Sequence, residues 1–279
     1  MTLFTHYLDG DHVTLCADVG GNPKAPAVVF LHGGGQTRHS WSKAARSLVD
    51  QDYHCLALDL RGHGDSKWAE NGDYKVDAFI ADLKAVISTL HHLPVLVGAS
   101  LGGATCLLAV GESSEPLAKA LVLVDVVPRM VPVGIRHIHD FMRGNPQGFA
   151  TLEDAADAVA AYIPDRPRPS SPQGLLKNLR LKGDGRYHWH WDPQFQNDRS
   201  RTDMGELTIR MENAARHVHI PTLLVRGKQS EVVSQEGVQH LLELIPHAQY
   251  VDVEGAGHMV AGDRNDVFNQ AIEGFLRGF

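Results

Sequence analysis

The chain has 279 residues, of which 43% are hydrophobic and 21% are charged, and its formal net charge is −7. This length and composition are typical of one large globular domain, with or without an insertion. The negative charge argues against a nucleic-acid partner, which requires a basic face. We see no signal peptide and no apolar run near the ~18 residues of a membrane span, so we expect a cytoplasmic protein without a membrane partner.

The first half of the chain alternates short apolar runs with stretches of helical periodicity. The runs predict strands over residues 13–18, 27–31, 54–59, 94–97 and 120–124. Apolar residues three and four apart predict helices over residues 40–49 and 76–90, and a run of small or apolar residues predicts a buried helix over residues 102–110. Such alternation is typical of a mostly parallel sheet with helices on both faces, and catalytic groups in such sheets lie at the carboxyl ends of the strands.

The pattern changes at Pro128, after which helical pieces and loops replace the buried strands. Strands and helices resume near residue 220, with strands expected over 222–225 and 250–253 and helices over 235–245 and 265–276. We therefore interpret residues 1–127 and 220–279 as a core, and residues 128–219 as a cap inserted into it.

Between a predicted strand and a predicted helix lies the segment Gly98-Ala99-Ser100-Leu101-Gly102. Its Gly-x-Ser-x-Gly spacing is that of a nucleophile elbow, a sharp turn that holds a serine in strained backbone. Glycines at the flanking positions avoid collision with the neighbouring strand and helix. The turn presents the Ser100 hydroxyl at a helix N-terminus, where free N–H groups can bind an oxyanion.

A second glycine-rich segment, His32-Gly33-Gly34-Gly35, follows the strand predicted over residues 27–31. Glycines allow the backbone to approach a ligand closely and to direct N–H groups toward it. A plain glycine turn is the alternative. A phosphate-binding loop is disfavoured because no Gly-Lys-Ser/Thr follows.

Four motifs together resemble the α/β-hydrolase superfamily over nearly the whole chain. They are His32-Gly33-Gly34-Gly35, Asp59-x-Arg61-Gly62-His63-Gly64-x-Ser66, Gly98-x-Ser100-x-Gly102 and Gly255-x-Gly257-His258. Within this superfamily the chain is most similar to capped serine esterases, enol-lactonases and carbon–carbon bond hydrolases. The resemblance implies an α/β-hydrolase fold, with a mainly helical cap after the sixth strand of the sheet, and no cofactor.

The resemblance also implies a catalytic triad, in which Ser100 is the nucleophile and His258 is the base. The superfamily usually places the acid three or four residues past a glycine, after the strand that follows the cap. Here Ser230 occupies the commonest position after Gly227, so we prefer Glu231, one residue further on. Asp125, at the end of the preceding predicted strand, is the alternative acid.

The backbone N–H groups of Gly34 and Leu101 are the expected oxyanion donors. Residues expected to contact the substrate are His32, Gly33, Gly35, Trp189, Trp191 and Met259. The two tryptophans could instead only anchor the cap. Three His-x-His pairs, at 137/139, 188/190 and 217/219, suggest a metal, but no coherent third ligand follows, and we predict none.

A serine at the elbow favours acyl chemistry. We therefore expect hydrolysis of a small carboxylic ester, lactone or related carbonyl compound through an acyl-enzyme. A carbon–carbon bond hydrolase or a perhydrolase with the same triad is an alternative, and a non-catalytic binding protein that retains the pocket is a more remote one. The sequence does not indicate an oligomeric state.

Overall fold

The computed structural model describes residues 2–164, 168, 171–197, 202–258 and 265–278. Its centre is an eight-stranded sheet in the order β1-β2-β4-β3-β5-β6-β9-β10. The strands are β1 (Phe4–Asp9), β2 (Thr14–Gly20), β3 (Ala27–Leu31), β4 (His54–Leu58), β5 (Val95–Ala99), β6 (Ala120–Val124), β9 (Thr222–Gly227) and β10 (Gln249–Val253). β1 and β2 are antiparallel to their neighbours. The other strands of this sheet, β4, β3, β5, β6, β9 and β10, pair in parallel. The prediction of an α/β-hydrolase fold with a mostly parallel sheet is therefore confirmed.

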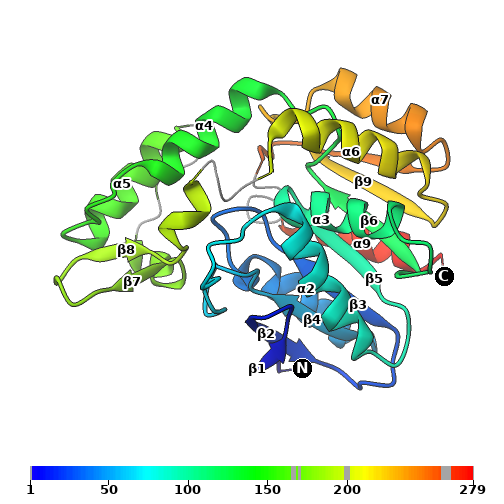
Figure 1. Ribbon diagram of the computed structural model, residues 1–279, viewed down its shortest axis with the longest axis horizontal. Helices are drawn as coiled ribbons and strands as arrows, with labels where there is room; N and C mark the ends of the chain where they lie inside the picture. Colours follow the sequence, from blue (N-terminus) through cyan, green and yellow to red (C-terminus); the bar gives the residue numbers. More distant parts are fainter. Residues whose placement is uncertain (1, 165–167, 169–170, 198–201, 259–264, 279) are drawn as a thin grey trace.

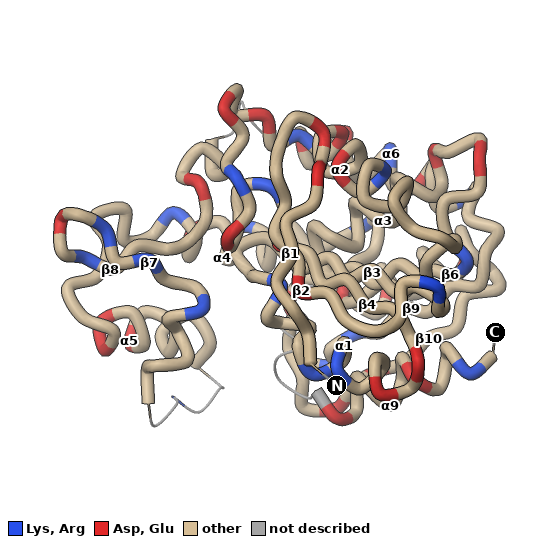
Figure 2. The backbone as a smooth tube through the Cα atoms, turned by 90° about the horizontal axis from the view of Figure 1, so that it is seen from below, with Lys and Arg blue, Asp and Glu red and all other residues tan. Residues whose placement is uncertain are grey.

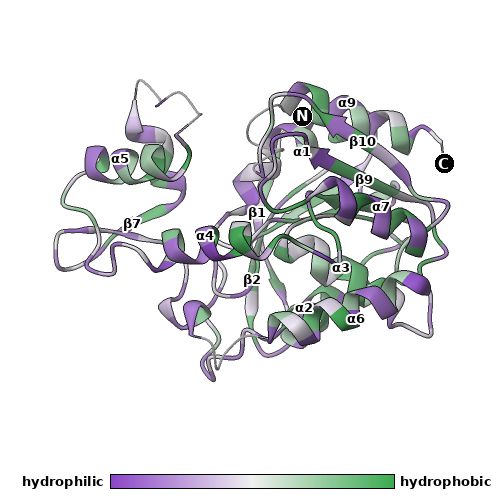
Figure 3. Ribbon diagram, turned by 90° about the horizontal axis from the view of Figure 1, so that it is seen from above, coloured by the Kyte–Doolittle hydropathy of each residue, from purple (hydrophilic) through white to green (hydrophobic). Residues whose placement is uncertain are grey.

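Helices cover both faces of the sheet (Figure 3). One face carries α1 (Ser42–Val49), after the short 3-10 helix Arg38–Trp41, and α9 (Asn265–Leu276). The other carries α2 (Val76–Ser88), α3 (Leu101–Gly111), α6 (Met204–Arg216) and α7 (Gln235–Leu244). The central strands β3, β4, β5 and β6 are buried along their whole length, which explains their continuous apolar runs.

The segment between β6 and β9 projects from one side of the sheet (Figure 1). Its elements are α4 (Pro132–Arg143), α5 (Leu152–Tyr162), the 3-10 helices Pro172–Lys177 and Pro193–Gln196, and an antiparallel pair, β7 (Leu179–Leu181) and β8 (Tyr187–Trp189). α6 also falls between β6 and β9, but it packs against α3 and α7 in the layer that covers the sheet. The division into a core and a cap of residues 128–219 stays a prediction.

Three parts of the fold were not predicted from the sequence. β1 is an edge strand with mostly exposed side chains, so its sequence has no apolar run. β7 and β8 have three residues each, too few for a period to be visible. α4 was expected only as unspecified helical structure; Gly134 and Met142 are its buried residues, and Ile135, Ile138 and Phe141 are partly buried.

Lysine and arginine residues are interspersed with aspartate and glutamate over both the sheet domain and the inserted segment (Figure 2). Within the described residues, no helix has the length and apolar character needed to cross a membrane.

Candidate active site

Ser100 stands at the junction of β5 and α3 in a strained backbone conformation. Its φ of 47° and ψ of −115° lie outside the regions that non-glycine residues usually adopt. A Cβ atom at Gly98 would lie 2.5 Å from the carbonyl oxygen of Gly102, and one at Gly102 would lie 2.5 Å from that of Leu31. Both glycines are therefore required for the helix to begin this close to the sheet.

The glycine loop after β3 lies directly beside Ser100. A Cβ atom at Gly33 would come within 3.3 Å of the Ser100 Cβ, which shows how closely this loop approaches the elbow. Gly35 has a φ of +75° and packs against Met142 and Trp191. Among the described residues, none accepts a hydrogen bond from the N–H of Gly34 or of Leu101, so both N–H groups are available to a ligand.

Four adjacent strands bring together the polar groups of the site. Ser100 follows β5, Asp125 follows β6, Ser230 follows β9 and His258 follows β10, and these strands are neighbours in the order β5-β6-β9-β10. The Nδ1 atom of His258 lies 2.6 Å from Oδ2 of Asp125. His258 and Ser100 line the same cavity. Parallel pairing thus places these groups along one edge of the sheet.

Glu231, the acid preferred from the sequence, does not contact His258. Its exposed carboxylate faces Nδ1 of His137 on α4, with both oxygens 3.3 Å away. The inward position in this loop belongs to Ser230, whose hydroxyl donates a hydrogen bond to Asp125. The next side chain, Glu231, therefore points to solvent, and the carboxylate beside His258 is that of Asp125, which the sequence had offered only as the alternative.

His32 is buried beneath the glycine loop and does not line the cavity, so the expectation that it contacts the substrate is wrong. Its Nε2 accepts a hydrogen bond from the N–H of Leu60, and its Nδ1 lies 2.7 Å from the carbonyl oxygen of Gly33. Burial lowers the pKa of His32 to about 4, so the ring is neutral and stabilises the loop. Met259 lies outside the described residues.

The cavity beside Ser100 has a volume of about 450 Å³ and a mostly apolar lining. Gly33, Gly34, Gly35 and the stacked pair Trp189 and Trp191 all line it, and their contact with a substrate stays a prediction. The tryptophan rings are 5.0 Å apart with an interplanar angle of 12°. Further apolar lining comes from α4 and α6, through Ile138, Phe141, Met142, Met204 and Leu207.

His190 joins the inserted segment to the glycine loop and forms a cluster of three histidine rings with His63 and His32. Nδ1 of His190 accepts a hydrogen bond from the N–H of Gly64, so its Nε2 donates to the carbonyl oxygen of Gly35, 3.2 Å away. The ring lies 5.8 Å from that of His63, which lies 5.2 Å from that of His32. Burial lowers the pKa of His63 to about 3 and that of His190 well below the ordinary value.

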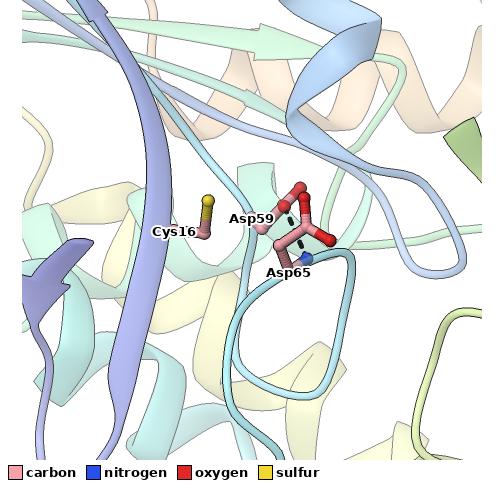
Figure 4. Close-up of side chains that lie close together, drawn as sticks. All are labelled: Cys16, Asp59 and Asp65. Atoms are coloured by element: carbon pink, nitrogen blue, oxygen red, sulfur yellow. Dashed lines mark hydrogen bonds between the residues drawn. The ribbon is translucent and has the colours of Figure 1, made fainter. Parts of the chain in front are cut away.

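A separate group of Cys16, Asp59 and Asp65 offers three potential metal ligands (Figure 4). The guanidinium of Arg38 pairs with both carboxylates, through a hydrogen bond to Asp59 and one of 2.8 Å to Asp65. Burial raises the pKa of the Cys16 thiol to about 11, which keeps it protonated. A cation is therefore already present as an arginine side chain, and these residues do not fit a metal.

Two of the three His-x-His pairs, 137/139 and 188/190, direct their rings to different places in the folded chain. His137 faces Glu231, whereas His139 lines the cavity. His188 contacts Asp184, whereas His190 binds the backbone near Gly64. Their ring nitrogens therefore serve different partners.

Comparison with known proteins agrees with the architecture. The model of the alpha/beta hydrolase fold family matches residues 26–264, and the chain belongs to this family.

Among curated proteins, an esterase of Mycobacterium tuberculosis is 30% identical over 263 residues, which cover 90% of this chain and 83% of the esterase. The sn-1-specific diacylglycerol lipase of Mus musculus is 28% identical over 264 residues, covering 92% and 82%. Among solved structures, E-2-(acetamidomethylene)succinate hydrolase has a TM-score of 0.86 at 23% identity and covers 99% of both chains. These relatives support a hydrolase of the α/β fold.

Proposed function

We propose that the chain is a serine hydrolase that cleaves carboxylic esters, lactones included, through an acyl-enzyme on Ser100. The observation that carries the proposal is the 2.6 Å contact between His258 and Asp125 at the cavity that Ser100 lines. A hydroxyl is a weak nucleophile at neutral pH and needs a base. An imidazole held by a carboxylate is such a base, because the carboxylate stabilises the imidazolium that forms.

In the proposed reaction, Nε2 of His258 takes the proton of the Ser100 hydroxyl while Oγ attacks the ester carbonyl. The N–H groups of Gly34 and Leu101 stabilise the negative oxygen of the tetrahedral intermediate. The imidazolium returns the proton to the leaving alcohol as the C–O bond breaks. Water, deprotonated by His258, then attacks the acyl-enzyme carbonyl. The imidazolium returns this proton to Oγ of Ser100 as the bond between the acyl carbon and Oγ breaks, which releases the acid and restores the free enzyme. Asp125 accepts the hydrogen bond from Nδ1 throughout.

The apolar lining supports a substrate with an apolar acyl or alcohol group of moderate size. A cavity of about 450 Å³ suits a small molecule, and aromatic and aliphatic side chains bind such groups by removing them from water. We assign residues 128–219 to the cap that supplies most of this lining.

The test is the Ser100→Ala variant, assayed with an aryl ester. We expect turnover to fall by on the order of 10⁴. The control is Ser88→Ala, which changes an exposed serine at the end of α2. A fluorophosphonate should label the wild type on the peptide that contains Ser100, and not the Ser100→Ala variant.

Retained ester turnover in Ser100→Ala would reject the serine mechanism. Absence of both turnover and labelling in the wild type would favour a non-catalytic binding protein. Labelling of Ser100 with faster turnover of a vinylogous 1,5-diketone than of any ester would favour carbon–carbon bond hydrolysis.

A further inference from the structure

A serine hydroxyl contacts the same carboxylate oxygen as the imidazole of His258. The Oγ atom of Ser230 lies 2.6 Å from Oδ2 of Asp125, the distance at which Nδ1 of His258 also lies. We propose that Ser230 is a positioning residue that holds the carboxylate of Asp125 for His258. The inference rests on the serine mechanism proposed above and adds a residue to it.

The direction of the Ser230 hydroxyl follows from its other partners. A hydroxyl has one proton to donate and two lone pairs that accept. The Ser230 oxygen accepts hydrogen bonds from the N–H groups of Val232 and Val233, both at 3.1 Å. With both acceptor sites occupied, the remaining proton points to Asp125. The loop after β9 therefore fixes a donor rather than a freely rotating hydroxyl.

Asp125 needs such donors because it is fully buried. A buried carboxylate keeps its charge only when hydrogen bonds replace water. Its Oδ1 accepts a hydrogen bond from the N–H of Gly227 at 3.0 Å, and its Oδ2 accepts one from Ser230 and one from His258. One donor on Oδ1 and Ser230 on Oδ2 define the plane of the carboxylate, and this plane directs Oδ2 toward the imidazole.

Removal of the Ser230 hydroxyl has two expected consequences. The carboxylate gains rotational freedom, so fewer molecules hold His258 in the reactive orientation and kcat falls. The carboxylate also loses a donor that competes for Oδ2, so it attracts the imidazolium more strongly. The acid limb of the pH profile of kcat/KM should therefore move to higher pH.

The experiment compares Ser230→Ala with the wild type, using an aryl ester, and repeats the comparison in an Asp125→Asn background. We expect Ser230→Ala to lower kcat by about tenfold with little change in KM, and to raise the acid limb by about half a pH unit. In the Asp125→Asn background the same change should alter kcat less than twofold, because the carboxylate that Ser230 orients is gone. Ser230→Thr keeps the hydroxyl and should restore most of the activity.

Ser234→Ala is the matched control. Ser234 lies in the same loop, and its hydroxyl accepts a hydrogen bond from the N–H of Gly237 at the start of α7. Its loss should lower the thermal midpoint without moving the pH profile.

Two results would overturn the proposal. One is an equal loss of kcat from Ser230→Ala in both backgrounds, which would mean that Ser230 only closes the turn at Val232 and Val233. The other is an unchanged kcat and pH profile. Either result, obtained with turnover that still depends on Ser100, leaves the proposed function intact, whereas turnover independent of Ser100 would reject that function itself.

Discussion

The Nδ1 atom of His258 and the Oδ2 atom of Asp125 are 2.6 Å apart, although the two residues are 133 positions apart in the chain. The pairing arises because β6 and β9, and β9 and β10, are neighbours in the sheet. Asp125 adopts a φ of 49°, and its N–H donates to the carbonyl oxygen of Val225 on β9, which holds the carboxylate at this edge.

We predict that Asp125→Asn lowers kcat by on the order of 10³ to 10⁴, because an amide stabilises the imidazolium poorly and can hold the wrong tautomer. Glu231→Gln is the matched control, since it makes the same chemical change on the residue preferred from the sequence. Its kcat should stay within about twofold of the wild type, because the Glu231 side chain is exposed and its carboxylate faces His137 and not His258. Steady-state kinetics of the two variants decide which carboxylate is the triad acid. A large loss of kcat in Glu231→Gln with little change in Asp125→Asn would assign that role to Glu231.

The elbow predicts a sharp contrast between two glycine substitutions. Gly98→Ala would place a Cβ 2.5 Å from a backbone oxygen of α3, so we expect a loss of about 2 kcal/mol or more in unfolding free energy, together with loss of activity. Gly274→Ala, at an exposed position in the last turn of α9, meets no atom within 4 Å and should stabilise the protein by about 0.4–1 kcal/mol. Urea unfolding measures both, and a Gly98→Ala variant as stable as the wild type would contradict the tight packing described here.

Substrate preference should follow the apolar cavity. Across p-nitrophenyl esters of increasing acyl length, kcat/KM should rise by about fourfold per methylene, the factor that corresponds to ~0.8 kcal/mol for each buried CH₂. The rise should end when the chain fills the cavity of about 450 Å³. An ester of matched length that ends in a carboxylate is the control, and we expect it to react at least about tenfold more slowly because burying the charge is unfavourable. An equal kcat/KM for all acyl lengths would show that the acyl group does not bind in this cavity.

The buried histidines predict sensitivity to acid. The pKa values of His32 and His63 are lowered by burial to about 4 and about 3, and that of His190 lies well below its ordinary value. An unfolded histidine titrates near ~6.5, so the unfolded state binds more protons than the folded state below that pH. The free energy of unfolding should therefore be independent of these histidines above about pH 6.5. It should fall as the pH is lowered toward 4, by up to about 1.4 kcal/mol per pH unit for each histidine.

Urea midpoints measured between pH 7.5 and 5 test this dependence. His63→Phe removes one titrating ring from the cluster, in which the His63 Nε2 has no hydrogen-bond partner among the described residues. In this variant, the slope of the free energy of unfolding against pH should correspond to about one proton fewer taken up on unfolding. Equal stability at pH 7.5 and pH 5 in the wild type would contradict the burial of these rings.

Local features of the sequence determined much of the fold. The apolar runs at residues 27–31 and 120–124 coincide with β3 and β6, because a strand buried on both faces tolerates few polar residues. The Gly-x-Ser-x-Gly spacing around Ser100 identified the elbow, since only glycine fits where the helix begins against the strand. These are short-range constraints, so the sequence states them directly.

Only the tertiary structure decided which carboxylate meets His258. From the sequence, Glu231 and Asp125 both follow predicted strands, and residue order cannot reveal which side chain points inward. The Ser230 hydroxyl occupies the inward position of its loop and turns Glu231 to solvent, while strand neighbours bring Asp125 to the imidazole. The same holds for His32, whose place in a glycine motif suggested contact with the substrate, but whose ring is buried beneath the loop. Side-chain direction depends on contacts between distant segments, and those contacts exist only in the folded chain.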